Sequence, residues 1–199
     1  MIMDIKDFAN YTKSLKKELD ELMRRQMPIT AGRMAKNHFQ DNFRKGGFVN
    51  GGFHPWPKTI RQSSGGVDAY SNNGPLLSGN NHLFESIKYE PGDYRVRVSN
   101  ELLYAPYHNW GADITVTERM RKYAWHRYYE EIGGTPKAKG KEKTKGGEKT
   151  SRNSFWKNLA LTKKTKLHIP QRQFLGESRE IREQIEQRTE EEIRKIINS

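Results

Sequence analysis

The chain has 199 residues, contains no cysteine and carries a formal net charge of +12 at pH 7. This length suits one domain with a long appendage, and the lack of cysteine excludes disulfides, thiolate metal sites and cysteine nucleophiles. Hydrophobic residues make up 33% of the chain and the mean hydropathy is −1.00, so we expect a moderate core and some unburied chain. Self-association would bury the remaining apolar faces.

Helical spacing of apolar residues predicts a helix over residues 4–23. Its apolar face consists of Ile5, Phe8, Leu15, Leu19 and Leu22. Pro28 is tolerated in a first helical turn but not inside a helix, so we expect the first helix to be interrupted and a second to begin there. The core face of the second helix is expected to be Ala31, Ala35, His38 or Phe39, and Phe43.

Turn-forming residues break the periodicity over residues 44–75, which predicts a long irregular loop. Phe48, Phe53 and Trp56 lie within this loop and need an apolar surface to pack on. We expect the stretch from Phe48 to Trp56 to be mobile in a free subunit and to become ordered against neighbouring subunits. Its backbone amides would then exchange fast in the monomer and slowly after assembly.

Alternation of apolar and basic residues from Tyr94 to Ser99, preceded by a turn at residues 90–93, predicts a β-hairpin that begins near Leu83. An aromatic segment over residues 103–110 follows and ends at Gly111. A short strand is expected at residues 114–116. Thr117 then has the character of an N-cap for a helix that reaches Tyr128.

Residues 133–152 hold six lysines, one arginine and five glycines against two glutamates, and almost nothing apolar. We expect this segment to be a flexible basic insert. Residues 167–169 can form a last strand before Pro170. Isoleucines at helical spacing between Gly176 and Ile197 predict a closing helix.

The polar residues suggest no catalytic, metal or cofactor site. The six histidines stand singly, without the paired spacing that zinc hydrolases use. His108 followed by Asn109 could serve a nuclease as a base and its orienting partner, but the aromatic run around them favours packing. Ser78 lacks the glycine-flanked turn of a hydrolase nucleophile. We also expect no signal peptide and no membrane span.

Three islands of the sequence follow one another in a recognisable order. The first covers residues 43–57, where a helix ends in Phe43, a glycine-rich turn follows and Trp56 precedes a polar loop. The second runs from Leu76-Leu77-Ser78-Gly79 to Tyr104-Ala105-Pro106-Tyr107-His108-Asn109-Trp110-Gly111. The third is Ile169-Pro170-Gln171-Arg172-Gln173-Phe174-Leu175-Gly176. Together, the three islands resemble the phage virion morphogenesis family, whose members act as tail completion proteins.

The resemblance implies a single α+β domain over residues 1–199, with a small antiparallel sheet flanked by long N-terminal and C-terminal helices. It implies a structural subunit, not an enzyme, that joins a ring-like connector at tail completion or head-tail joining. Its partners would be further copies and other head-tail or tail proteins. The subunit would be assembled in the host cytoplasm and located in the virion.

The resemblance also marks residues for structural or interaction roles: Phe48, Phe53, Trp56, Leu77, Ser78, Gly79, Tyr104, His108, Gly111, Pro170, Arg172 and Phe174. Tyr104, His108 and Gly111 would form a tight aromatic turn beside the sheet. Pro170 and Arg172 would fix the start of the last helix, with the guanidinium bonded to carbonyls or a carboxylate. For both sets, fold stability is favoured over partner contact.

Two alternatives stay open. A nucleic-acid-binding module would use the basic arm at residues 137–149 and helix residues such as Arg24, Arg25, Arg33 and Lys36 to grip phosphates. Its binding would be weak, nonspecific and steeply dependent on salt. A virion-associated nuclease or peptidase would lose its activity in His108→Ala while keeping its fold.

Overall fold

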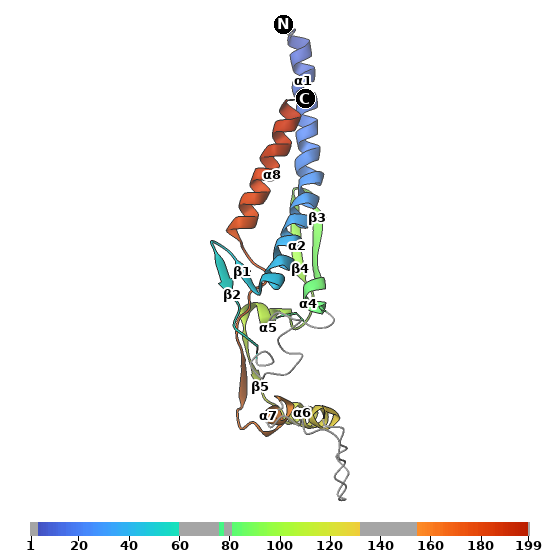
Figure 1. Cartoon of the computed structure of the whole chain (residues 1–199). Helices are drawn as coiled ribbons and strands as arrows, with labels where there is room; N and C mark the ends of the chain where they lie inside the picture. Colours follow the sequence, from blue (N-terminus) through green and yellow to red (C-terminus); the bar gives the residue numbers. More distant parts are fainter. Residues whose placement is uncertain (1–3, 60–75, 78–80, 132–154, 199) are drawn as a thin grey trace, which may run out of the picture.

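The computed structural model describes residues 4–59, 76–77, 81–131 and 155–198. Two expected site residues, Ser78 and Gly79, and the basic insert at 133–152 lie outside this described part. The molecule is elongated, with both chain ends at one extremity (Figure 1). Long helices stand near the N- and C-termini, and the described strands pair antiparallel, so the α+β expectation is confirmed. The strands form three separate two-stranded sheets in place of one sheet.

The chain begins as one continuous helical rod. Helix α1 spans Ile5–Glu21, a π-helical turn η1 spans Leu22–Gln26, and α2 spans Met27–Lys45. The expected second helix does begin at Pro28, which occupies the first turn of α2, but the expected interruption is a π-helical turn and not a break in the rod.

A second chain segment makes this continuity possible. Pro28 has no N–H, so it cannot donate to the Arg24 carbonyl four residues earlier. The wider turn of η1 makes room for the proline ring, and Met27 N–H bonds to the Leu22 carbonyl. The N–H of Tyr94, on a neighbouring hairpin, donates to the freed Arg24 carbonyl at 3.1 Å. The open acceptor in the rod is thereby satisfied without a break.

That hairpin consists of β3 (Ile87–Gly92) and β4 (Arg95–Asn100) and follows the short helix α4 (His82–Glu85). The hairpin is confirmed, but its turn lies at Asp93 and Tyr94, later than the expected turn at residues 90–93. Tyr94 adopts a left-handed φ of 57°, and its hydroxyl donates to Asp20. These contacts with the rod position the turn.

Helix α2 packs closely on the hairpin at Gly32. A Cβ added there would lie 2.4 Å from Cδ2 of Tyr89 and 2.8 Å from Cγ2 of Val96. Glycine therefore sets the distance between the rod and the sheet.

The start of the expected loop at 44–75 is not irregular. Gly46, with φ of 71°, ends α2, and a small hairpin follows, made of β1 (Gly47–Val49) and β2 (Phe53–Pro55). The sequence analysis missed it because each strand has only three residues and the turn formers between them masked the pattern.

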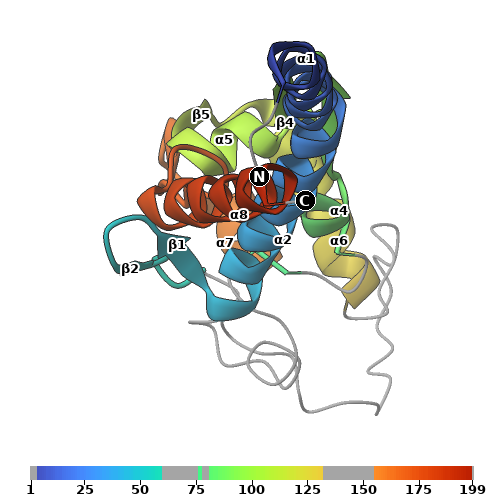
Figure 2. The ribbon, with the colours of Figure 1, turned by 90° about the horizontal axis from the view of Figure 1, so that it is seen from above.

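The last helix, α8, spans Arg179–Ile197, and its N-cap is Ser178, whose hydroxyl accepts the Ile181 N–H at 3.4 Å. The turn of the β1–β2 hairpin makes further contacts with this end of α8. The Asn50 side chain accepts the Arg179 N–H at 3.1 Å, and the Glu180 carboxylate accepts the Gly52 N–H at 3.0 Å. Seen from above, the hairpin lies beside α8 (Figure 2). The closing helix is confirmed, and contacts between residues about 130 positions apart join its start to the hairpin.

A long arm leaves the body on its far side from the chain ends (Figure 1). Helix α5 (Ala105–Trp110) leads into β5 (Ala112–Thr115), which pairs with β6 (Lys166–Ile169). Helices α6 (Glu118–Glu131) and α7 (Phe155–Leu161) pack together at the end of this ribbon. The expected strands and the N-cap at Thr117, whose hydroxyl accepts the Met120 N–H at 3.2 Å, are confirmed.

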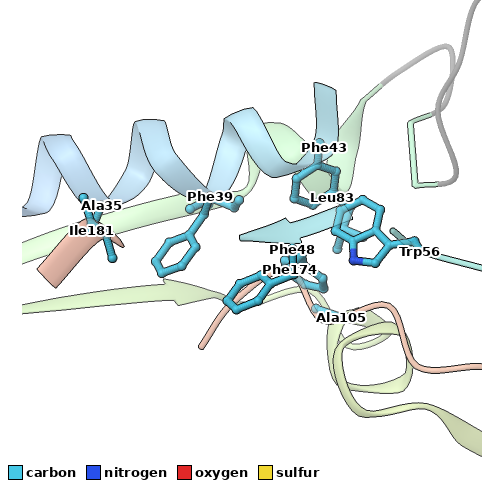
Figure 3. Close-up of a cluster of buried hydrophobic side chains, with 10 residues drawn as sticks. Ala35, Phe39, Phe43, Phe48, Trp56, Leu83, Ala105, Phe174 and Ile181 are labelled. Carbon is cyan, nitrogen blue, oxygen red and sulfur yellow. The ribbon is translucent and has the colours of Figure 1, made fainter. Parts of the chain in front are cut away.

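The core is aromatic at its centre, where Phe43 is fully buried (Figure 3). Its ring lies 5.4 Å from that of Trp56 and 5.3 Å from that of Phe174. Burial of a side chain of this size contributes roughly 1.5–3 kcal/mol. The buried cluster comprises Ala35, Phe39, Phe43, Phe48, Trp56, Leu83, Ile87, Ala105, Phe174 and Ile181. The predicted core face of α2 is thus confirmed.

Candidate functional site

Three segments distant in the sequence meet at one buried junction, which we call the Arg172 junction. They are residues 56–58 after β2, residues 104–111 around α5, and residues 169–176 between β6 and α8. The structure thereby brings together many of the expected site residues: Trp56, Tyr104, His108, Gly111, Pro170, Arg172 and Phe174.

Arg172 is the charged centre of the junction, and only 5% of it is exposed. Its Nε donates to the Pro57 carbonyl at 2.8 Å, and its Nη2 donates to the Lys58 carbonyl at 3.1 Å. Its backbone N–H donates to the His108 carbonyl at 2.7 Å. Burial lowers the pKa of Arg172, but a guanidinium stays protonated in proteins. The expected bonding to carbonyls is confirmed, and it ties together all three segments.

Asn109 is a second buried connector, a role that the sequence did not indicate, since the residue was singled out there only as a possible partner of His108 in a nuclease. Its Oδ1 accepts the backbone N–H groups of both Phe174 and Leu175 at 2.9 Å, and the residue is 5% exposed. Its carbonyl accepts from the Gln171 side chain at 3.1 Å. The only signal was a short amide inside an aromatic run just before a glycine, and that pattern is also typical of a turn.

The indole of Trp56 completes the junction by donating from Nε1 to the Gln173 carbonyl at 2.8 Å. Its ring meanwhile packs edge-on against Phe43 in the core. Trp56 therefore connects the polar junction to the apolar centre.

Gly111 allows the chain to turn from α5 into β5 beside β6. Its φ is 74°, and an added Cβ would lie 3.0 Å from both the Ile169 carbonyl oxygen and the Gln171 nitrogen. Side chains avoid this conformation, and backbone atoms cannot move aside cheaply. The rings of Tyr104 and His108 meet edge-on at 6.2 Å next to this turn, as expected.

The remaining expected site residues are divided between core and surface. Phe48 is buried and its ring stacks on that of Phe39, while Leu77 is partly buried against the core cluster. Phe53 is 51% exposed. The Phe48–Trp56 stretch forms a paired hairpin with both end residues buried and its turn bonded to α8. Its expected fast amide exchange in the free subunit and protection after assembly stay a prediction.

Two half-buried histidines, His38 and His108, are expected to make the stability of the fold depend on pH. Burial lowers the pKa of both His38 and His108, and the charge of Arg172 lowers that of His108 further. The unfolded chain, with histidine pKa values of about 6.5, then binds more protons than the folded chain. Stability is therefore full above about pH 6.5 and falls as the pH drops toward the lower folded values.

Thermal unfolding between pH 7.5 and pH 5 measures this effect above the range where carboxylates titrate. The wild-type midpoint is expected to fall more steeply than that of the His38→Gln/His108→Gln variant. Equal slopes for the two proteins would contradict the prediction.

Several large apolar side chains face solvent away from the junction. At the free end of α1, Ile5 is 84% exposed and Phe8 58%. Around α5, Leu103 is 92% exposed and Trp110 69%. On the arm, the exposed apolar side chains include those of Tyr123 and Leu161. Such side chains, gathered on separate faces, mark candidate contact surfaces.

The described polar groups offer little for catalysis. No group of three or more His, Asp or Glu side chains within the described ranges is placed to hold a metal ion. A pocket of about 350 Å³ lies beside the Arg172 junction, but its lining contains no carboxylate. That lining consists of Phe48, Asn50, His54, Pro55, Trp56, Pro57, Gln171 and Gln173. None of the helices in the described part has the length and apolar content to cross a membrane.

No family model, no curated protein and no solved structure matches this chain. The resemblance to virion morphogenesis proteins thus depends on the three sequence islands. Residues of the second and third islands meet at the Arg172 junction together with Trp56 and Pro57 of the first.

Proposed function

We propose that this chain is a structural subunit of a phage or prophage particle and not an enzyme. It acts in virion assembly, at tail completion or head-tail joining, by packing with further copies and with other head-tail or tail proteins in a ring-like connector. The observation that carries the proposal is an elongated subunit that displays apolar side chains at separated places (Figure 1). An isolated protein gains nothing from such exposure, whereas a subunit of an assembly buries it.

The apolar stripe of α1 is the first of these surfaces. Its members recur every seven residues, as in a coiled-coil seam, with one row at Phe8, Leu15 and Leu22. Leu22 is buried and Leu15 is half-buried, but Phe8 is exposed. Helix α8 meets α1 where the Tyr11 hydroxyl donates to the Ile197 carbonyl at 3.5 Å, and α1 continues past this point (Figure 1). The apolar stripe of α1 therefore extends beyond the part of α1 that α8 meets.

The exposed side of α5 is a second, different surface. Trp110 and Tyr107 point away from a helix whose Ala105 and Asn109 are buried, and Leu103 precedes them on the loop. Aromatic side chains are enriched where proteins contact one another. A ring subunit needs two unlike surfaces, one for each neighbour, and the α1 stripe and the α5 surface meet this requirement.

Deletion of the reading frame from the phage or prophage that carries it tests the proposal. We expect particles whose heads and tails remain unjoined, or whose tail ends are incomplete, in electron micrographs. Expression of the chain in trans should restore joined, infectious particles. Normal particles after deletion, or a reading frame without portal, capsid and tail genes beside it, would contradict the proposal.

Variants of the α1 stripe sharpen the same experiment. The Ile5→Ala/Phe8→Ala variant is expected to weaken self-association at least about tenfold in native mass spectrometry or sedimentation, because each side chain loses a burial worth roughly 1.5–3 kcal/mol when complete. It should also fail to restore joined particles. The matched control, Asn10→Ala/Ser14→Ala, changes exposed polar residues on the other side of α1 and should behave as wild type.

A further inference from the structure

The helix pair at the end of the arm carries a strong local charge. Residues 118–131 and 155–166 contain eight lysines and arginines against three glutamates, a net charge of +5. Helix α1 has four basic and four acidic residues, and α8 has five basic and six acidic residues. Residues 22–45 of η1 and α2 carry the same net charge, with six basic residues against Asp41, but three of these six form ion pairs. The arm therefore places a second positive region at the extremity opposite the chain ends (Figure 1).

Most of these cations have no internal counter-charge. Arg127 pairs with Glu130 at 2.7 Å, whereas the other lysines and arginines of the pair form no ion pair with any described residue. The exposed ones are Arg119, Lys122, Lys163, Lys164 and Lys166. By contrast, Arg179, Arg188, Arg194 and Lys195 of α8 each pair with a glutamate of the same helix. The arm thus presents exposed cations that are available to an external anion.

The fold places these cations close together, on one face of α6 and on the chain after α7. Arg119, Lys122, Tyr123 and His126 follow the spacing of one helical face, and all four are exposed. The Val116 N–H donates to the Thr165 carbonyl at 2.8 Å, which holds residues 163–166 beside the start of α6. Lysines after α7 and the first turns of α6 therefore neighbour each other.

Aromatic rings lie among these charges. Tyr123 is 56% exposed and meets the ring of Trp156 edge-on at 5.9 Å. The Arg127 guanidinium lies 5.7 Å from the centre of the Trp156 ring, and the Lys157 ammonium lies 5.9 Å from that of Tyr128. Cations beside an exposed ring suit nucleic acid, whose phosphates take the charges and whose bases stack on rings. An acidic protein surface would use the cations but not the ring.

We propose that the exposed side of α6 and α7 binds nucleic acid without sequence preference. Phosphates contact Arg119, Lys122 and the lysines of residues 163–166, and an unpaired base stacks on Tyr123. This site differs from the rod residues that the sequence suggested, of which Arg24 pairs with Asp93 and Arg25 with Glu21. It is also independent of the ring-forming role.

Fluorescence anisotropy of the full chain with labelled 20-nucleotide DNA, single-stranded and duplex, tests the proposal at several salt concentrations. The Arg119→Gln/Lys122→Gln/Lys164→Gln variant should lower the slope of log affinity against log salt on duplex DNA by about 2 to 3, since each phosphate contact contributes about 0.9. Tyr123→Ala should weaken single-strand binding at least about fivefold and leave duplex binding nearly unchanged.

Matched variants distinguish binding at the α6–α7 site from binding that depends only on the net charge of the protein. Lys13→Gln/Lys16→Gln/Lys17→Gln removes the same charge from exposed positions of α1 and should keep wild-type binding. Equal losses in both triple variants would overturn the proposal. So would binding that disappears when the six lysines of residues 137–149 become glutamine yet survives the α6–α7 triple variant. Tight binding of poly-glutamate without binding of DNA would instead indicate an acidic protein and would also overturn it.

Discussion

Replacing Arg172 with methionine is expected to lower the free energy of unfolding by about 3 kcal/mol. The change removes the charged donor that bonds to the Pro57 and Lys58 carbonyls and leaves both acceptors without this partner in a part-buried site. Methionine is apolar and of comparable length, so the loss reports the hydrogen bonds more than the lost volume. Urea unfolding followed by tryptophan fluorescence measures it, since Trp56 lies in the same junction.

The matched control is Arg182→Met, the same change at an exposed position of α8. Substitutions at such surface sites usually alter stability by no more than about 0.5 kcal/mol. A similar small loss in Arg172→Met would show that the junction does not stabilise the fold.

Asn109→Ala is expected to cost about 2–4 kcal/mol. The Phe174 and Leu175 N–H groups would lose their acceptor in the interior, and each unsatisfied buried donor costs about 1–3 kcal/mol. The start of α8 should also lose protection against amide exchange, because residues 174 and 175 lead into it. Hydrogen exchange at these two amides, together with urea unfolding, measures both effects.

Two further variants serve as controls for Asn109→Ala. Asn158→Ala removes an exposed amide from α7 and should leave stability nearly unchanged. Asn109→Asp keeps an oxygen that can accept both N–H groups, so the two amides should stay protected at neutral pH. Fast exchange of both amides in Asn109→Asp would argue that the acceptor oxygen is not what orders this segment.

The Arg172 junction and the exposed surfaces have separate tasks. The junction residues are mostly buried and bond to backbone groups, which agrees with the expectation that Pro170 and Arg172 serve fold stability more than partner contact. Apolar and basic side chains available to partners lie instead on α1, on the outer side of α5 and on the arm. We therefore expect junction variants to unfold the subunit and surface variants to leave a folded subunit that fails to associate.

Local patterns in the sequence were sufficient for most helices and strands. The spacing of Ala31, Ala35, Phe39 and Phe43 predicted the buried face of α2, because a helix with one apolar side can bury only that side. The β3–β4 hairpin, the strand before Pro170 and the N-cap at Thr117 follow from equally local rules. The small β1–β2 hairpin escaped prediction because its strands are too short to show alternation.

Contacts between distant segments decided the rest. Tyr94 supplies the donor for the Arg24 carbonyl that Pro28 leaves without an intrahelical partner, and Asn50 adds an acceptor for the Arg179 N–H at the start of α8, whose N-cap is the local Ser178. Asn109 acts as a connector because the fold places the N–H groups of residues 174 and 175 within hydrogen-bond distance of its side chain. By itself the sequence determined which segments are helical or extended and which residues seek burial, since these depend on neighbours along the chain. Only the tertiary structure decided which hydrogen-bond partner each buried polar group has, because these partners lie far away in the sequence. For the same reason, only the tertiary structure decided which apolar faces are packed against other segments and which stay exposed.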